Sequence, residues 1–266
     1  MSAASASGVR EAREGRVLRL AFDRPQARNA LQPEMSRAMT QALRRAASDP
    51  ELGAVVLHGE GGHFCAGGDL RSLAESRRSE PPAHHLERVG HLNEFVRAIR
   101  QCPLPVLAAV EGHAAGAGCV LALACDLLVA AEDAQFTMAY VKAGLSPDGG
   151  GTWLLVRSLP RQLAAELALT GTPIGARRLA ELGVVNRLAA PGQALAEALA
   201  WAARIAEGPR RAIGRIKRLL AQAAARDQAE QMELEREAFV EALHGAEAGE
   251  GIAAFLAKRK AVFPRD

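Results

Sequence analysis

Short apolar segments in the first half of the chain alternate with longer amphipathic ones. Residues 17–22 alternate apolar and polar side chains before an Asp-Arg-Pro turn, a pattern that predicts a strand. Residues 34–47, after Pro33, and residues 84–100 repeat apolar positions at helical spacing. Three short apolar runs bounded by turn residues are expected as buried strands: residues 54–58, 106–110 and 127–130. Alternating strands and helices predict an α/β core with parallel crossovers.

Beyond residue 151 the pattern changes, and helical spacing dominates. The helices expected there cover residues 161–169, 176–182, 193–207, 209–225, 228–244 and 248–259. The chain therefore divides into a flexible tail over residues 1–15, a core over residues 16–200 and a C-terminal helical region over residues 201–266. Residues 71–82 are charged and end in prolines, so they are expected to form a mobile surface segment.

Composition places the 266-residue chain among ordinary globular proteins, with 49% apolar and 24% charged residues. Such a chain can bury a sizeable core, so intrinsic disorder is excluded. Aromatic residues are scarce at 4%, and Tyr140 is the only tyrosine. The net charge of +3 is spread over interspersed acidic and basic residues. Both features argue against a nucleic-acid partner, whose binding relies on exposed aromatic side chains or a basic stripe.

The sequence favours a cytoplasmic protein with no membrane association. The Ser/Ala-rich start lacks the apolar segment of a signal peptide, and no apolar run reaches the roughly 18 residues of a membrane span. The four cysteines show no Cys-x-x-Cys spacing, which indicates free thiols in a reducing cytoplasm. The histidines lack the spacing of metal ligands to other donors, so no metal site is expected.

Two glycine-rich turns, at residues 64–70 and 112–118, each follow a predicted strand. Small residues let another group approach the backbone closely, and free N–H groups at a helix N-terminus can receive developing negative charge. Two such turns can form a two-donor oxyanion hole, but tight turns and close helix packing also account for them. A dinucleotide-dependent oxidoreductase is a weaker interpretation. The second turn contains Gly116-x-Gly118, but Leu121 stands where that fingerprint requires a third glycine.

A third candidate lies in residues 144–153, where Asp148 follows a proline and precedes three glycines. An aspartate in this setting is suited to cap a helix or to form a turn. Held rigidly in a site, the same carboxylate would instead transfer protons. The spacing alone leaves both interpretations open.

Together these blocks resemble the crotonase superfamily, the enoyl-CoA hydratase/isomerase fold, over residues 17–263. The motifs that carry the resemblance are residues 24–25, 29–31, 64–70, 108–118, 125–126, 134–136, 169–171 and 255–259. The resemblance implies a spiral of repeated ββα units, followed by C-terminal helices that mediate trimerisation, often into a dimer of trimers. It also implies an acyl-CoA thioester as substrate. Coenzyme A is then part of the substrate, and no separate cofactor is expected.

The resemblance also implies the positions of the site. The backbone N–H groups of Gly68 and Ala117 match the family's oxyanion hole, which binds the thioester carbonyl and stabilises the enolate formed when a proton leaves the α-carbon. Lys258 matches a lysine that reaches the coenzyme A phosphates, usually from a neighbouring subunit. Positions lining the coenzyme A site are matched by Ala27, Arg28, Ala66, Asp69 and Leu70.

Two positions depart from the hydratase pattern. A hydratase of this family uses two glutamates to activate water and pass its proton, and the corresponding positions hold Val120 and Tyr140. Valine transfers no protons, and the ordinary tyrosine pKa of about 10 makes Tyr140 a poor base at neutral pH. Hydration by two glutamates is therefore not expected. Tyr140 either packs in the acyl pocket or hydrogen-bonds near the thioester.

Asp148 is the carboxylate that remains. Residues 135–155 resemble the 1,2-epoxyphenylacetyl-CoA isomerase and enoyl-CoA isomerase subgroup, which uses an aspartate at this position. One carboxylate suffices to remove a C2 proton and return it at C4, and an apolar pocket would raise its pKa towards the working range. We therefore predict an acyl-CoA isomerase that shifts a double bond or opens an epoxide, with Asp148 as acid and base. The alternatives are an enoyl-CoA hydratase or other lyase, and a non-catalytic acyl-CoA-binding homologue.

Overall fold

The larger of two sheets has six strands. In the computed structural model, which describes residues 7–265, their order is β1-β2-β3-β4-β6-β9. The strands are β1 (Val9–Glu14), β2 (Val17–Phe22), β3 (Ala54–Gly59), β4 (Val106–Val110), β6 (Leu127–Ala131) and β9 (Arg187–Ala189). β1 and β2 pair antiparallel, and every other neighbouring pair is parallel. The four strands predicted from the sequence, β2, β3, β4 and β6, are confirmed as neighbours in this sheet.

The smaller sheet has three strands in the order β5-β7-β8. They are β5 (His113–Ala115), β7 (Gln135–Thr137) and β8 (Ile174–Gly175). From β4 to β7 the strands alternate between the two sheets: β4 and β6 join the large sheet, and β5 and β7 join the small one. Because α4 (Ala117–Ala124) follows β5, the segment β4-β5-α4 is a strand–strand–helix unit of the kind expected for a spiral.

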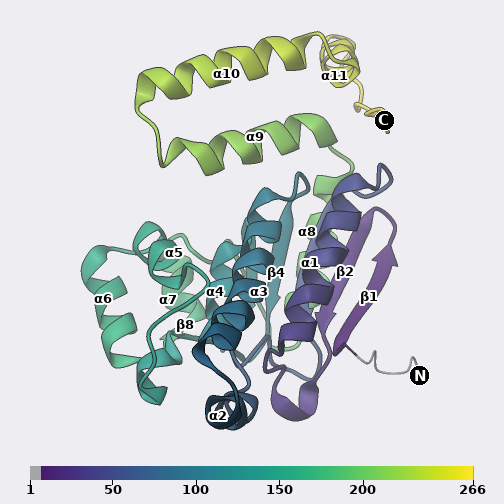
Figure 1. The fold of residues 1–266 in the computed structure, drawn as a ribbon. Helices are drawn as coiled ribbons and strands as arrows, with labels where there is room; N and C mark the ends of the chain where they lie inside the picture. Colours follow the sequence, from purple (N-terminus) through teal and green to yellow (C-terminus); the bar gives the residue numbers. More distant parts are fainter. Residues whose placement is uncertain (1–6, 266) are drawn as a thin grey trace.

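Helices cover both faces of the large sheet (Figure 1). α1 (Pro33–Ser48) and α3 (Pro82–Gln101) pack together on one face, and α8 (Ala194–Ala206) covers the other. Neighbouring residues of β3 enter different cores, since Leu57 packs on the side of α1 and α3 whereas Val56 packs on the side of α8. Burial on both faces explains why the strands are uninterrupted apolar runs in the sequence. α8 meets the sheet through buried alanines spaced four residues apart: Ala194, Ala198, Ala202 and Ala206.

The C-terminal helices stand apart from this core in Figure 1. They are α9 (Arg210–Ala223), α10 (Gln228–Leu243) and α11 (Ala246–Leu256). Across the described residues 210–256, only Ala238 and Ala254 are buried. The remaining short helices are α2 (Leu70–Ser79), α5 (Gly151–Ser158), α6 (Arg161–Thr170), α7 (Ala176–Glu181) and the 3-10 helices η1 (Pro25–Ala27) and η2 (Ala139–Ala143). Within residues 7–265 no helix has both the length and the apolar character needed to cross a membrane.

The structure corrects the predicted organisation in three places. Val9–Glu14 pair with β2 along their whole length, so the predicted flexible tail is wrong for these residues; residues 1–6 of that tail lie outside the described residues. Residues 70–79 form α2, a helix that their charged pattern did not predict. The predicted boundary between residues 200 and 201 falls inside α8, which belongs to the core because it packs on the large sheet.

Candidate active site

The two glycine-rich turns lie against each other. Cys65 and Ala114 pair in a parallel bridge. The Cys65 N–H donates to the His113 oxygen at 3.1 Å, and the Ala115 N–H donates to the Cys65 oxygen at 2.9 Å. A Cβ atom on Gly67 would stand 2.7 Å from the Ala115 oxygen, and Gly67 has a φ of +89°. Both the close approach and the positive φ require glycine at this position.

Each turn contains a predicted donor whose backbone N–H group meets no acceptor within residues 7–265. Ala117 is the first residue of α4, so the helix offers its N–H no partner. Gly68 pairs with Leu31 in a bridge whose hydrogen bonds are made by the Gly67 oxygen and the Asp69 N–H. The N–H of Gly68 itself takes no part in this bridge. Among residues 7–265 neither of these two N–H groups meets an acceptor. The predicted oxyanion donors therefore lie free on turns that touch, since the Ala117 nitrogen is 3.3 Å from the Cβ position of Gly67.

Asp148 lies on the irregular loop between η2 and α5. Its carbonyl oxygen accepts the Gly151 N–H at 2.9 Å, while the residue that caps α5 is Gly150. The Asp148 side chain makes no bond to the helix and instead accepts a hydrogen bond from Tyr140, whose Oη lies 2.7 Å from Oδ1. The helix-capping interpretation of this side chain is therefore wrong, and its half-buried carboxylate is available for chemistry.

Burial sets the electrostatics of this pair. It raises the pKa of Asp148, and the hydrogen bond from Tyr140 opposes that rise. Burial also raises the pKa of Tyr140, and the negative charge of Asp148 raises it further. The phenol therefore keeps its proton, and the carboxyl is the group that titrates. A carboxyl whose pKa is raised towards neutrality is suited both to take and to return a proton.

Apolar side chains pack tightly against the loop that carries the aspartate. Val120 of α4 is fully buried, with one methyl group 3.2 Å from the Cβ position of Gly149 and the other 2.8 Å from that of Gly151. Leu92 of α3 comes within 3.1 Å of the Gly149 position, and Met138 comes within 3.1 Å of the Gly151 position. Val120, at the position predicted to hold the first glutamate in a hydratase, is thus part of the apolar packing around this loop.

Tyr140 links the aspartate to the second glycine turn. Its Cζ lies 4.0 Å from the Cβ position of Gly116, which directly precedes Ala117. Its hydroxyl reaches Asp148. The structure therefore brings four predicted site residues into one region: Gly68, Ala117, Tyr140 and Asp148.

Three predicted coenzyme A contacts also reach this region. η1 ends at Ala27, and the next two residues, Arg28 and Asn29, have φ values of +48° and +58°. The Arg28 oxygen accepts the Ala66 N–H at 3.0 Å, which ties the N-terminal loop to the first glycine turn. Asn29 belongs to a motif but received no role from the sequence. It is fully buried, and its Nδ2 donates to two backbone oxygens after β3 at 2.9 and 2.7 Å.

Asp69 is largely occupied by structural contacts. Its Oδ1 accepts two backbone N–H groups and so caps α2, and its Oδ2 lies 3.1 Å from Nη2 of Arg24. Leu70 begins α2 and is 58% exposed. Asp69 thus shapes the turn at Gly68 through its partners, whereas Leu70 offers apolar surface beside it.

Lys258 is not brought to this region within the chain. It is exposed and follows α11, and Figure 1 shows α11 at the opposite end of the molecule from α2. Because α2 begins two residues after Gly68, the lysine and the first glycine turn of the same chain are far apart. A contact from a neighbouring subunit stays a prediction.

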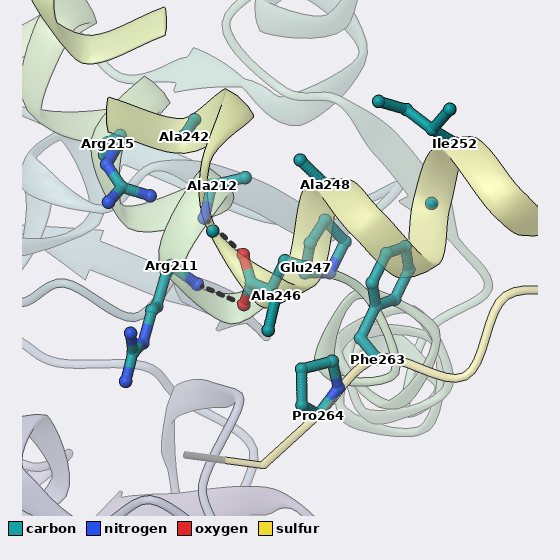
Figure 2. Close-up of a pocket in the computed structure, with 13 residues that line it drawn as sticks. Arg211, Ala212, Arg215, Ala242, Ala246, Glu247, Ala248, Ile252, Phe263 and Pro264 are labelled. Atoms are coloured by element: carbon teal, nitrogen blue, oxygen red, sulfur yellow. Dashed lines mark hydrogen bonds between the residues drawn. The ribbon is translucent and has the colours of Figure 1, made fainter. Parts of the chain in front are cut away.

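Two cavities lie in the C-terminal region, and neither is lined by the residues of the glycine turns. The first, of about 300 Å³, lies between α9, α11 and the last residues of the chain (Figure 2). There the Glu247 carboxylate accepts the N–H groups of Arg211 and Ala212 at 2.8 and 2.9 Å, which caps α9. The second, of about 900 Å³, lies between the end of α3 and α9, and half of its lining residues are arginine or lysine.

Comparison with known proteins agrees with the geometry. The profile of the family described as enoyl-CoA hydratase/isomerase matches residues 12–266. The 1,2-epoxyphenylacetyl-CoA isomerase of Escherichia coli is 36% identical over 248 residues, covering 93% of this chain and 94% of that protein. A probable enoyl-CoA hydratase of Rhodobacter capsulatus is 38% identical over 242 residues, covering 90% of this chain and 91% of that protein.

Solved structures show the same architecture. The crystal structure of an enoyl-CoA hydratase from a Polaromonas species matches with a TM-score of 0.94 and 47% identity, covering 96% of this chain and 99% of that chain. The two sheets, the repeated strand–strand–helix step and the C-terminal helices are those of the crotonase fold, as predicted. The chain belongs to the enoyl-CoA hydratase/isomerase family. Its relatives carry the names of both activities.

Proposed function

We propose that the protein is an acyl-CoA isomerase in which Asp148 moves a proton and the backbone N–H groups of Gly68 and Ala117 hold the thioester oxygen. The observation that carries this proposal is a half-buried carboxylate joined through Tyr140 to a turn with an unused N–H group. The identity to an isomerase of Escherichia coli over nearly the whole chain supports it.

The proposed reaction needs no co-reactant. The Asp148 carboxylate removes a proton from C2 of a 3-enoyl-CoA, and the electron pair of that C–H bond moves into the thioester, giving a dienolate. The resulting carboxylic acid then returns the proton to C4, and a double bond forms between C2 and C3. Atoms and electrons balance within the substrate, because the proton leaves and returns through one side chain.

The oxyanion donors lower the energy of the dienolate. Its negative charge gathers on the thioester oxygen, which the two N–H groups meet without reorganising. By analogy with other oxyanion holes, each donor is worth about 3 kcal/mol. Ala117 adds the positive end of α4, since it begins that helix.

Hydration is the competing activity. The names of the relatives from Rhodobacter capsulatus and the Polaromonas species favour it. Against it stands Val120, which is fully buried against the loop of Asp148 and offers no second carboxylate. Tyr140, at the other glutamate position, keeps its proton because both burial and Asp148 raise its pKa. Activation of water by two carboxylates is therefore not the proposed chemistry.

The remaining proposals concern the substrate and the assembly. Ala27, Arg28 and Ala66 would contact coenzyme A beside Gly68, and Lys258 of a second subunit would reach its phosphates. The assembly would be a homotrimer or a dimer of trimers, as the family resemblance implies. Large apolar side chains that lie open to solvent on the C-terminal helices support an interface between subunits there: Leu220, Phe239, Phe255 and Leu256. A cytoplasmic location, an acyl-CoA thioester as partner and no separate cofactor complete the proposal.

A turnover screen tests the proposal directly. Purified protein is incubated separately with a 3-enoyl-CoA, a 2-enoyl-CoA and an aryl-epoxide acyl-CoA. The products are separated by chromatography, and their masses are determined by mass spectrometry. The proposal expects an isomer of unchanged mass from the first or third compound. Addition of water to the 2-enoyl-CoA as the main reaction would establish a hydratase. Binding of all three without turnover would establish the non-catalytic homologue.

A further inference from the structure

The two oxygens of the Asp148 carboxylate have different surroundings, because Tyr140 bonds to Oδ1 alone. Tyr140 Oη donates to Oδ1 at 2.7 Å. Within residues 7–265 the other donor to this carboxylate is the backbone N–H of Asp148 itself, so no second residue holds Oδ2. Oδ2 is therefore the oxygen left for a ligand. The Tyr140 ring is itself held in place, because it packs against the apolar core and lies next to Gly116.

We propose that Tyr140 is a positioning residue, which fixes Oδ1 of Asp148 so that Oδ2 faces the substrate and which favours the ionised carboxylate before each turnover. The inference rests on the proposed function, since it assigns the use of Asp148 as a base. It differs from both roles expected from the sequence, because Tyr140 acts through Asp148 rather than on the thioester or as packing alone.

The chemistry of the pair supports this role. A phenol that stays protonated next to a carboxylate donates its hydrogen bond to the charged form of that carboxylate. Burial raises the pKa of Asp148, and the Tyr140 hydrogen bond acts in the opposite direction. The phenol thus limits how far burial raises the pKa of Asp148. This matters because the protonated carboxyl cannot accept the proton that begins the reaction.

Few other titratable groups face the pair. Among residues 7–265, the titratable group that acts on Tyr140 besides Asp148 is Cys119 of α4. Its thiol is fully buried, and burial raises its pKa to about 12, so it is neutral in the working range. The coupling between Tyr140 and Asp148 is therefore expected to appear as a simple two-group interaction.

The single tyrosine gives a direct measurement that does not depend on activity. Protein labelled with ¹³C at the tyrosine Cζ shows one labelled ring signal, which belongs to Tyr140. We expect this signal to shift in a titration step above the ordinary aspartate pKa of about 3.9 as Asp148 takes up its proton. The step should vanish in Asp148→Asn and persist in Asp133→Asn, a control at an exposed position before β7. Absence of the step in the wild type, or its survival in Asp148→Asn, overturns the proposal.

The pH profile of Tyr140→Phe tests the functional half, using a 3-enoyl-CoA that the wild type converts. Phenylalanine keeps the ring and removes the hydroxyl, and with it the hydrogen bond to Oδ1 of Asp148. We expect the acid limb of kcat/KM to move up by about one pH unit, and kcat to fall about tenfold with little change in KM. A purely structural role predicts lower activity with an unmoved acid limb, and that result overturns the proposal.

The activity of Asp148→Asn and the pH profile of Tyr140→Phe together separate this inference from the proposed function. If Asp148→Asn keeps full isomerase activity, the proposed function fails whatever Tyr140 does. If Asp148→Asn is inactive but Tyr140→Phe has the pH profile of the wild type, the proposed function stands and the positioning role fails.

Discussion

The guanidinium of Arg24 lies 3.1 Å from Oδ2 of Asp69, and both side chains are mostly withdrawn from water, at 19% and 14% exposure. Arg24 stands in the loop after β2, and Asp69 directly follows the proposed donor Gly68. The other carboxylate oxygen of Asp69 holds the start of α2. The Asp69 side chain therefore ties the turn at Gly68 both to the loop after β2 and to the start of α2.

We expect Asp69→Ala to lower the free energy of unfolding by about 3 kcal/mol, because it leaves Arg24 unpaired and removes the cap of α2. Chemical denaturation of the two proteins measures this difference. Glu181→Gln is the matched control, since it breaks an exposed pair with Arg178 and should cost less than about 1 kcal/mol. Equal losses in the two variants would show that the half-buried pair of Arg24 and Asp69 contributes no more to stability than an exposed pair.

The same contact predicts a dependence on pH. Burial raises the pKa of Asp69, but the Ser72 N–H and Arg24 outweigh it and leave the pKa below its ordinary value. Because the folded pKa is lower than the unfolded one, the contribution to stability is present above about pH 3.9 and is lost as the pH falls through the folded pKa. The stability difference between wild type and Asp69→Ala should therefore shrink in acid, which denaturation at several pH values checks.

Asp148→Asn is expected to lose activity and gain stability at neutral pH. Without the carboxylate the proposed proton transfer falls by about 10²–10⁴-fold. The pKa of Asp148 is raised by burial, so the folded state binds its proton more tightly than the unfolded state. The charged side chain therefore costs stability above its folded pKa, and this cost disappears as the pH falls below the unfolded value. Asparagine removes it, so Tm should rise at pH 7 and match the wild type in acid.

Asp133→Asn controls for the loss of one negative charge. Asp133 is exposed, so its replacement should change neither Tm nor turnover. Full isomerase activity in Asp148→Asn, with acyl-CoA binding intact, would remove the aspartate from the mechanism.

The sequence predicted those parts of the fold that a local pattern determines. β3 and β4 were recognised because burial on both faces makes them continuous apolar runs, and the amphipathic helices because one face is apolar. β1 was missed because its strand, with exposed Glu11, Arg13 and Glu14, pairs only at the edge of the sheet. Its formation depends on β2 rather than on its own residues.

The candidate site was found through motifs, but its contacts were not. Gly68, Ala117 and Asp148 belong to recognisable blocks of sequence. No local pattern places the Tyr140 hydroxyl on Asp148, because the contact depends on how η2 and the loop before α5 fold back on each other. The pairing of Arg24 with Asp69 joins residues 45 positions apart and likewise requires the folded chain.

Gly67→Ala is expected to damage both stability and catalysis. The new Cβ would stand 2.7 Å from a backbone oxygen, at a φ of +89° that alanine rarely adopts. We expect a loss of about 2 kcal/mol in the free energy of unfolding, and a fall in kcat of about 10²-fold as the Gly68 donor moves. Denaturation and steady-state kinetics measure the two effects.

Gly90→Ala is the matched control for this substitution. Gly90 lies within α3 with no atom within 4 Å of its Cβ position. Alanine there should stabilise the protein by up to about 1 kcal/mol and leave kcat unchanged. If Gly67→Ala behaves like Gly90→Ala, the contact between the two turns does not control the donor.

Lys217→Met is expected to loosen the C-terminal helices from the core. The Lys217 ammonium is 2.6 Å from Asp126 and is 10% exposed, and it donates to the carbonyl oxygens of Ile99 and Leu104 at 2.9 and 3.0 Å. Methionine keeps the length of the side chain but leaves the Asp126 carboxylate without its cation, at a cost of about 3 kcal/mol. Because α9 has no buried residue of its own between positions 210 and 223, we expect faster amide hydrogen exchange in α9 than in the wild type.

The strand β4 provides an internal reference for this measurement, since it lies in the centre of the large sheet. Lys260→Met, at an exposed position after α11, controls for the loss of one positive charge and should leave exchange unchanged. If Lys217→Met speeds exchange equally in α9 and β4, the lysine supports the whole fold and is not a specific anchor. Selective exchange in α9 would identify Lys217 as a specific anchor between the core and the helices proposed to join the subunits.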